Sequence, residues 1–380
     1  MAKGRRTAAA FAVVQDKDKG RGHMAPRECI QSTQGGVTMK RRTLLGGGLS
    51  LAAISATGIM RPRAASAKTV NLRVASYAPA GNFVNDEIIA GFLDAVVADS
   101  EGTLAYQIFP GGTLGRNPTE QLRLVQDGVA DIALILPSFT PGALDTYGVI
   151  EIPGLINDPY EGSIALGEAL TAGLLPTPER TRMLGVFSTD VNILSLTAPV
   201  ASLDELKSKR IRVVGRPQVE AIKFLGAVPT SGITSPETAE AINRGTVDGA
   251  VMGPGALVAY RVSEVVRQHI PLPMGAPTMM LPMNAASWDR LSEPAQAAFV
   301  KHGGEPFSKF AGEIFKRQAQ HFLEQNLDME GHSVLEIDDA TMARFTEGTA
   351  PIADSFAARG PEFAAVLESM TASLERIRAQ

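Results

Sequence analysis

The stretch Leu203-Asp-Glu-Leu-Lys-Ser-Lys-Arg-Ile-Arg-Val-Val214 decides the fold. It predicts a short helix over 204–209 that leads into a strand over 210–214. Arg212 alternates with Ile211 and Val213, so its side chain is expected to point away from their apolar face. A guanidinium presents a planar set of donors that matches carboxylate oxygens. Arg212 is therefore either a cation that binds a small carboxylate at a cleft or one half of a structural salt bridge.

The remaining periodicity predicts an α/β fold with two lobes, an interdomain cleft and a helical C-terminal wrap. The first βαβαβ run has strands over 70–76, 103–109 and 132–136 and helices over 83–99 and 117–128. A second run has strands over 183–188, 193–197, 210–214, 227–230 and 248–252, with helices at 218–225 and from Ser235, the expected N-cap. A strand over 278–284 precedes four helices, over 287–302, 306–326, 339–358 and 361–378. We assign 68–190 plus about 281–305 to lobe I, and 191–280 plus about 306–380 to lobe II.

The N-terminal part carries a targeting pattern. Met39-Lys-Arg-Arg-Thr-Leu-Leu45 has twin arginines before a weakly apolar run over 44–59, and Ala65-Ser-Ala67 is typical of a cleavage site. The run is too short and too rich in glycine for a membrane span of about 20 residues. We predict a twin-arginine signal peptide over 39–67, an extension upstream of the true start over 1–38, and export to the periplasm. A frayed Gly/Ala-rich terminus is the alternative.

Removal of residues 1–67 would leave 24 of the 36 Lys and Arg and 37 of the 40 Asp and Glu, a net charge of −13. Such an acidic chain is a poor ligand for nucleic acid or anionic membranes. The single cysteine, Cys29, lies in the part that would be removed. The mature chain is therefore expected to be a free, exported protein with neither a disulfide nor a lipid anchor on cysteine.

Motifs for catalysis are missing from the sequence after residue 67. It has no nucleophile elbow, no P-loop and no His-Glu-x-x-His, and its four histidines lack ligand spacing. Enzymes of this size usually concentrate titratable groups in loops after strands, and no such cluster is visible. We therefore expect a binding protein with no cofactor; a metal ion that bridges the ligand stays an open possibility.

Several motifs, in order, resemble the TRAP transporter solute-binding proteins of the DctP type. These are Phe109-Pro-Gly-Gly-Thr-Leu-Gly115, Val125-Gln-Asp-Gly-Val-Ala-Asp131, the opening stretch to Arg212, Phe224-Leu-Gly-Ala227, Ala241-Ile-Asn-Arg-Gly-Thr-Val-Asp-Gly249 and Met283-Asn-Ala-Ala-Ser-Trp288. The resemblance spans roughly residues 70–323. It implies a periplasmic-binding-protein-like fold that closes on an organic acid and delivers it to the membrane subunits of a TRAP permease.

The resemblance also implies a site. Arg212 stands at the position of the family arginine that pairs with the ligand carboxylate, and Asn192 is an expected polar donor. Gly253 stands near the place of a family asparagine, and Ile193-Leu194 replaces a second family arginine. These departures, with the apolar stretch that contains Phe139, favour a monocarboxylate, aromatic or a keto or hydroxy acid.

Three residues at predicted strand ends, Tyr77, Phe139 and Met252, either contact the ligand or pack in the core. Arg216 either assists Arg212 or is solvated. Hinge motion is expected near Asp190 and Leu281. The chain is a monomer or a dimer. The alternatives to transport are a periplasmic receptor that senses a ligand for a signalling system and an exported enzyme.

Overall fold

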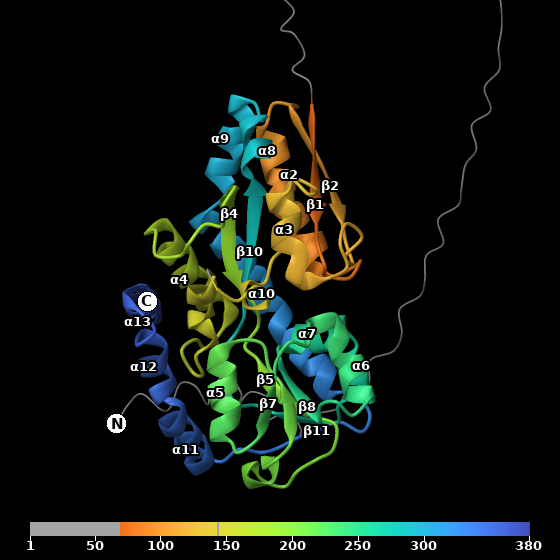
Figure 1. Ribbon diagram of the computed structural model, residues 1–380, viewed down its shortest axis with the longest axis vertical. Coiled ribbons are helices and arrows are strands. Elements are labelled where there is room, and N and C mark those ends of the chain that lie inside the picture. The colour runs from red at the N-terminus through yellow and green to blue at the C-terminus, as the bar shows by residue number, and fades with distance from the viewer. Residues whose placement is uncertain (1–68, 143) are drawn as a thin grey trace, which may run out of the picture. The chain divides into compact units, whose positions relative to one another are not determined.

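The computed structural model describes residues 69–142 and 144–380, which build two sheets flanked by helices (Figure 1). These described residues form one compact unit. The predicted extension over 1–38 and the predicted signal peptide over 39–67 lie outside the described residues. The two-lobe α/β architecture predicted from the sequence is confirmed, with one lobe around each sheet.

The first sheet has the strand order β2-β1-β3-β10-β4. Its strands are β1 (Val70–Ala75), β2 (Leu104–Phe109), β3 (Ile132–Ala133), β4 (Thr181–Ser188) and β10 (Thr278–Asn284). Strand β1 pairs in parallel with both β2 and β3, as the βαβαβ pattern predicted, whereas β10 runs antiparallel to β3 and β4. The carboxyl ends of β1 and β3 therefore lie at the same edge of the sheet.

The second sheet has the order β11-β9-β5-β8-β6-β7. Its strands are β5 (Ile193–Leu196), β6 (Arg210–Arg212), β7 (Val228–Thr230), β8 (Gly249–Met252), β9 (Gln268–Ile270) and β11 (Ser333–Val334). Strand β6 lies between β7 and β8 and is parallel to both, so Arg212 sits at the carboxyl end of an interior strand.

The chain passes between the sheets through two short segments. One joins Ser188 at the end of β4 to Ile193 at the start of β5, and the other covers 271–277 between β9 and β10. Because β10 pairs with β4 along its whole length, the second crossing lies before Thr278 rather than near Leu281, where the hinge was expected. The residue limits of the two lobes stay a prediction.

Helices cover both sheets. The π-helix Val84–Ile89 continues into α2 (Ala90–Asp99), and the other helices of nine residues or more are α4 (Pro159–Thr171), α5 (Arg216–Phe224), α9 (Glu293–His302), α10 (Glu305–Leu327), α11 (Asp339–Thr349) and α13 (Pro361–Arg378). The shorter ones are α3 (Gln121–Gln126), α6 (Thr238–Asn243), α7 (Pro254–Ala259), α8 (Ala285–Asp289) and α12 (Pro351–Ala357). Helix α10 packs on α4 and β4 of the first lobe and on α7 of the second, so it ties the two lobes together. Helix α13 packs on α4.

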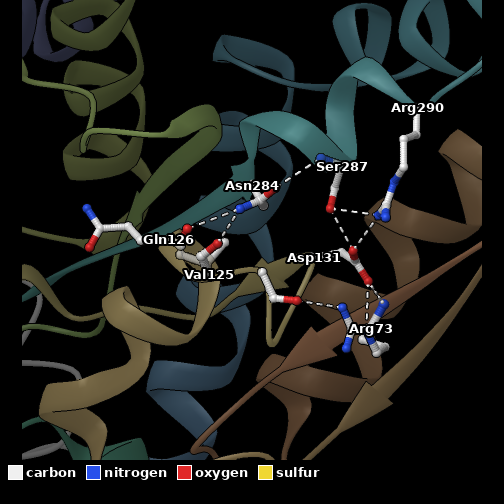
Figure 2. A network of polar contacts seen from close by, with 8 residues as sticks. Arg73, Val125, Gln126, Asp131, Asn284, Ser287 and Arg290 are labelled. Carbon is white, nitrogen blue, oxygen red and sulfur yellow. Dashed lines mark hydrogen bonds and ion pairs between the residues drawn. The ribbon is translucent and has the colours of Figure 1, made fainter.

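Two of the motifs that carry the family resemblance meet in a polar network of the first lobe (Figure 2). The buried carboxylate of Asp131 accepts hydrogen bonds from the backbone N–H and Nε of Arg73 at 2.8 and 3.1 Å. It also accepts from Oγ of Ser287 at 2.6 Å and from Nη2 of Arg290 at 3.0 Å. Asn284 caps α8 by accepting from the N–H of Ser287 at 3.0 Å. These motif residues therefore hold the sheet to α8 and leave the ligand to other groups.

The second lobe contains a similar aspartate–arginine pair. Asp248 directly precedes β8 and accepts from the backbone N–H, Nε and Nη2 of Arg210 on β6, at 2.8, 3.2 and 2.9 Å. In each lobe an aspartate at the amino end of one strand binds an arginine of the parallel neighbour. The opposite ends of these strands, the carboxyl ends, face the cleft.

Candidate functional site

A cavity lies between the lobes, where the carboxyl ends of β1, β3, β6 and β8 converge. The volume of the cavity is about 60 Å³. Since one water needs roughly 10–15 Å³ in this measure, the cavity holds about four to six water-sized groups. The first lobe contributes mainly apolar side chains and the second supplies the cation. The lining residues are Ala78, Asn82, Phe83, Val84, Leu136, Thr189, Asp190, Asn192, Arg212, Val214, Ser235, Met252, Gly253, Gly255, Ala256, Ala259, Tyr260, Pro277, Met279 and Phe315.

Arg212 is only 2% exposed, yet no carboxylate of the described residues pairs with it. Its Nε donates to the carbonyl of Ile233 at 3.0 Å and its Nη1 to the carbonyl of Val251 at 3.3 Å. Its Nη2 is buried without a protein partner. Burial lowers the pKa of Arg212 to about 10, against the opposing influence of Tyr77, Glu151 and Tyr260, so the guanidinium stays charged at neutral pH. A buried cation with a free donor is a site for an anion.

Four of the residues predicted for the site line this one cavity: Arg212, Asn192, Met252 and Gly253. The backbone of Asn192 is fixed in the first crossing segment by an N–H bond to the carbonyl of Gly275 at 2.8 Å. Its side chain forms no hydrogen bond within residues 69–142 and 144–380, which leaves its amide available to a ligand. Met252 ends β8, and Gly253 is the N-cap of α7.

The other three predicted residues lie outside the lining. Tyr77 and Phe139 contact each other edge to face, with ring centroids 6.3 Å apart, and both pack against the core of the first lobe. Within the described residues, the hydroxyl of Tyr77 is buried without a hydrogen-bond partner. Arg216 is on the surface, with its side chain 63% exposed, and pairs with Glu220 at 3.4 Å.

Asp190 in the cavity wall was expected only as a hinge residue. Its Oδ2 accepts from the backbone N–H of Gly255 at 2.6 Å. A side chain at Gly253 would collide with its Oδ1, so a glycine is needed there for the carboxylate to fit. Burial raises the pKa of Asp190 to about 6, against the bond from Gly255. The group is still mostly ionised at pH 7 and gives this part of the cavity a negative charge.

Glu151 is a second buried carboxylate that the sequence reasoning missed. It is 0% exposed and lies outside the cavity lining. Burial raises its pKa to about 7, while the hydrogen bond from Ser138 and the charge of Arg212 oppose that rise. A signal was present in the sequence, since Glu151 is the only charged residue between Tyr147 and Ile156.

The side chains of the described residues do not form a metal site. Within the described ranges, no group of three or more His, Cys, Asp or Glu side chains is placed to hold a metal ion. The only ionisable groups that line the cavity are Asp190, Arg212 and Tyr260. The arrangement can bind an organic anion by charge at one end and by apolar contact along its body.

Comparison with known proteins gives the class. The family model "Bacterial extracellular solute-binding protein, family 7" (DctP) matches residues 74–359. The C4-dicarboxylate-binding periplasmic protein DctP of Rhodobacter capsulatus is 25% identical over 279 residues, 72% of this chain and 83% of that protein.

Two solved structures share the fold. A TRAP solute-binding protein of an unidentified marine microbe, specific for aromatic acids and bound to 3-hydroxybenzoate, has a TM-score of 0.72 at 22% identity. The alignment covers 81% of this chain and 99% of that one. A TRAP periplasmic solute-binding protein of Bordetella bronchiseptica, bound to mandelate, has a TM-score of 0.73 at 21% identity, with coverage of 81% and 99%.

The chain belongs to the DctP family of extracellular solute-binding proteins, the binding components of TRAP transporters. The resemblance drawn from the sequence motifs is thereby confirmed. In the part of the chain that the structure describes, no helix combines the length and the apolarity needed to span a bilayer.

Proposed function

We propose that this protein captures a small organic monocarboxylate with an apolar, preferably aromatic body in the interlobe cavity and delivers it to the membrane permease. One observation carries the proposal: the guanidinium of Arg212 is buried at the cavity wall with Nη2 unpaired. The ligand carboxylate would accept from Nη2, and the amide of Asn192 would add a second donor. Such charged hydrogen bonds are strong because water is excluded from the cleft.

The rest of the cavity argues for one carboxylate rather than two. Arg212 is the only cation in its lining, and Asp190 adds a negative charge. Asp190 and Arg212 both line the cavity and form no ion pair with each other. A dicarboxylate would place its second carboxylate in a cavity of low dielectric constant that already carries the charge of Asp190, which is unfavourable. Phe83, Tyr260 and Phe315 instead supply aromatic side chains to the lining, against which a ring can pack.

The protein is proposed to act without catalysis. Three hydroxyls line the cavity, those of Thr189, Ser235 and Tyr260, and within the described residues none of them is hydrogen-bonded to a carboxylate or a histidine. Export by a twin-arginine signal over residues 39–67 belongs to the same proposal, because the ligand must be met outside the cytoplasm. Closure of the lobes would use the crossing segments at 189–192 and 271–277.

A thermal-shift screen tests the function. 3-Hydroxybenzoate, benzoate, mandelate and succinate would each be added to the purified protein. A ligand present at 100 times its dissociation constant adds about 2.7 kcal/mol to the free energy of unfolding and so raises Tm. The aromatic monocarboxylates are expected to raise Tm and succinate to have no effect. A response to succinate alone would contradict the assignment.

A further inference from the structure

Glu151 occupies the junction between the lobes. It ends the 3-10 helix Asp145–Glu151, and its side chain is fully buried. The hydroxyl of Ser138 donates to Oε1, while Oε2 is buried without a partner. The carboxylate therefore keeps a charged oxygen away from water with no hydrogen bond to support it, an arrangement that costs stability unless it serves a function.

The surrounding backbone is shaped to hold this carboxylate. The carbonyl of Ile150 accepts from the N–H of Ala276 at 2.9 Å, which ties the 3-10 helix to the second crossing segment. A Cβ at Gly215 would overlap Oε2 of Glu151, and a Cβ at Gly275 would overlap its backbone. Gly215 is the N-cap of α5 and lies three residues after Arg212, the last residue of β6. Glu151 thus reaches from one lobe to the segment that positions the cation.

Arg212 is the one cation of the described residues whose charge acts on Glu151, and Gly215, three residues further along the chain, lies against Oε2 of Glu151. The two side chains form no direct ion pair, but the charge of each acts on the other. Arg212 lines the cavity and Glu151 does not, so Glu151 can influence a ligand only through Arg212. Both groups are left with one buried, unpaired atom, Nη2 and Oε2.

Few other charges face Glu151. Asp145 of the same 3-10 helix acts on it, and Asp145 is itself paired with Arg359. Arg216 of α5 points to solvent and pairs with Glu220. Strand β10, the 3-10 helix Pro137–Phe139 and the segment 271–277 contain no charged residue, and no charge of α13 acts on Glu151. Its ionisation is therefore governed by burial, by the hydrogen bond from Ser138 and by the charge of Arg212.

We propose that Glu151 is the resident counter-charge of Arg212 and takes up a proton when the organic acid binds, so that the affinity for the anion falls as the pH rises. The inference rests on the proposed function. In the empty protein the positive charge of Arg212 favours the ionised carboxylate. A bound ligand carboxylate neutralises Arg212 and adds a negative charge, so the pKa of Glu151 rises from about 7 to a higher value.

Linkage fixes the size and the sign of the effect. Between the pKa of Glu151 in the empty protein and its higher pKa in the complex, binding takes up as much as one proton. Over that interval the dissociation constant rises by up to about tenfold per pH unit. Below pH 7 Glu151 is already protonated, and the dissociation constant levels off. Glu151 is thus a positioning residue: it does not contact the ligand, and its effect on the affinity is measured as proton uptake on binding.

Isothermal titration calorimetry with 3-hydroxybenzoate measures this exchange. At pH 7.5 the binding heat is recorded in phosphate and in Tris, two buffers that differ in their heat of ionisation, and the dissociation constant is followed from pH 6.0 to 8.5. The heats of the wild-type protein are expected to differ between the buffers by the uptake of several tenths of a proton. Glu151→Gln keeps an oxygen for the hydroxyl of Ser138 and should bind with no buffer dependence and a flat pH profile.

Controls separate the alternatives. Glu264→Gln removes a carboxylate of the same type that lies at the surface beside Arg261, and it should behave like the wild type. Uptake that persists in Glu151→Gln and disappears in Asp190→Asn would assign the proton to Asp190 and overturn the proposal. Wild-type binding with no buffer dependence overturns it as well and leaves the proposed function intact. If none of the screened acids binds, the proposed function fails and the inference fails with it.

Discussion

Replacement of Arg212 by methionine separates a ligand anchor from a structural ion pair. Burial lowers the pKa of Arg212 from 12.5 to about 10, so keeping this cation in the folded protein costs about 3 kcal/mol. At pH 7 the guanidinium is protonated in both the folded and the unfolded protein. Because its pKa is lower in the folded protein, the charged form destabilises the folded state at every pH below 10. Methionine removes that cost.

Methionine also removes two favourable contacts. The carbonyls of Ile233 and Val251 lose their donors, at about 1–3 kcal/mol for each buried group left unpaired. At the middle of that range the two losses total about 4 kcal/mol against a gain of about 3 kcal/mol, so the free energy of unfolding of the empty protein should fall by only about 1 kcal/mol. A structural salt bridge, the alternative raised by the sequence, would instead cost about 3–5 kcal/mol on removal of one partner.

Ligand binding should respond much more strongly. Removal of one partner of a buried, hydrogen-bonded charge pair costs about 2–5 kcal/mol of binding free energy, which raises the dissociation constant roughly 30-fold to several thousandfold. Urea denaturation of the empty protein and calorimetry with 3-hydroxybenzoate measure the two effects. Arg210→Met is the matched control, because Arg210 lies on the same strand and pairs with the partly exposed Asp248. It should cost under about 1 kcal/mol and leave the affinity unchanged. A loss of 3–5 kcal/mol in Arg212→Met with unaltered affinity would refute the reasoning.

Three further changes test the surroundings. Asn192→Ala should weaken binding of the same acid roughly tenfold in calorimetry, the value of one hydrogen bond to a charged group, and equal affinity would remove Asn192 from the site. Gly253→Ala places a Cβ on Oδ1 of Asp190 and should lower the free energy of unfolding in urea by about 1–3 kcal/mol, whereas Gly148→Ala, which meets no atom within 4 Å, should be neutral. Asp131→Asn should lower it by about 2–3 kcal/mol at pH 7. Despite burial, the hydrogen bonds from Ser287 and Arg73 hold the pKa of Asp131 below its ordinary 3.8. The stabilisation by the ionised carboxylate is therefore complete above pH 3.8 and is lost as the pH falls through the lowered pKa of the folded protein. If Asp131→Asn stayed less stable than the wild type below that pKa, the prediction would be contradicted.

The sequence predicted most regular elements because their local signals are strong. Asn117 does start a helix, accepting from the N–H of Thr119 at 3.0 Å. The N-cap expected at Ser235 is instead Thr234, which forms a capping box with Glu237. Adjacent Thr and Ser offer equivalent hydroxyls, and the choice between them depends on the geometry of the preceding loop.

Two predicted helices are each divided in the structure. The one expected over 287–302 consists of α8 and α9, and the one over 339–358 consists of α11 and α12. In the first case Ser292 caps a new helix by accepting from the N–H of Ala295 at 3.3 Å. In the second, Pro351 begins α12 because its ring and its missing N–H interrupt the helical ladder.

Helix α4 was missed although it has a clear start, with Asp158 accepting from the N–H groups of Tyr160 and Glu161. Its glycines weakened the helical pattern. The structure gives the reason for one of them: a Cβ at Gly167 would lie 2.8 Å from Ser308 of α10, so the glycine permits close helix packing. Such contacts join segments that are far apart in the sequence, so local sequence patterns do not predict them.

The site was predictable where one residue type carried the chemistry. Arg212 is an unusual residue for a buried strand, and its motif located it. Asp190 and Glu151 were harder, since a carboxylate beside a crossing segment looks like any loop residue until the fold shows that it is buried. The free donor of Arg212 likewise depends on which carbonyls the neighbouring strands present.

Arg210 and Arg212 show how position along one strand decides the role of an arginine. The two side chains are two residues apart and lie on the same face of β6. Arg210, at the amino end, meets Asp248 at the amino end of β8, just as Arg73 meets Asp131 in the other lobe. At the carboxyl end β8 offers Met252 and Gly253 instead of an acid, and Arg212 donates only two hydrogen bonds, both to backbone carbonyls. The fold therefore satisfies one arginine internally and leaves the other with a free donor at the edge where parallel sheets bind ligands.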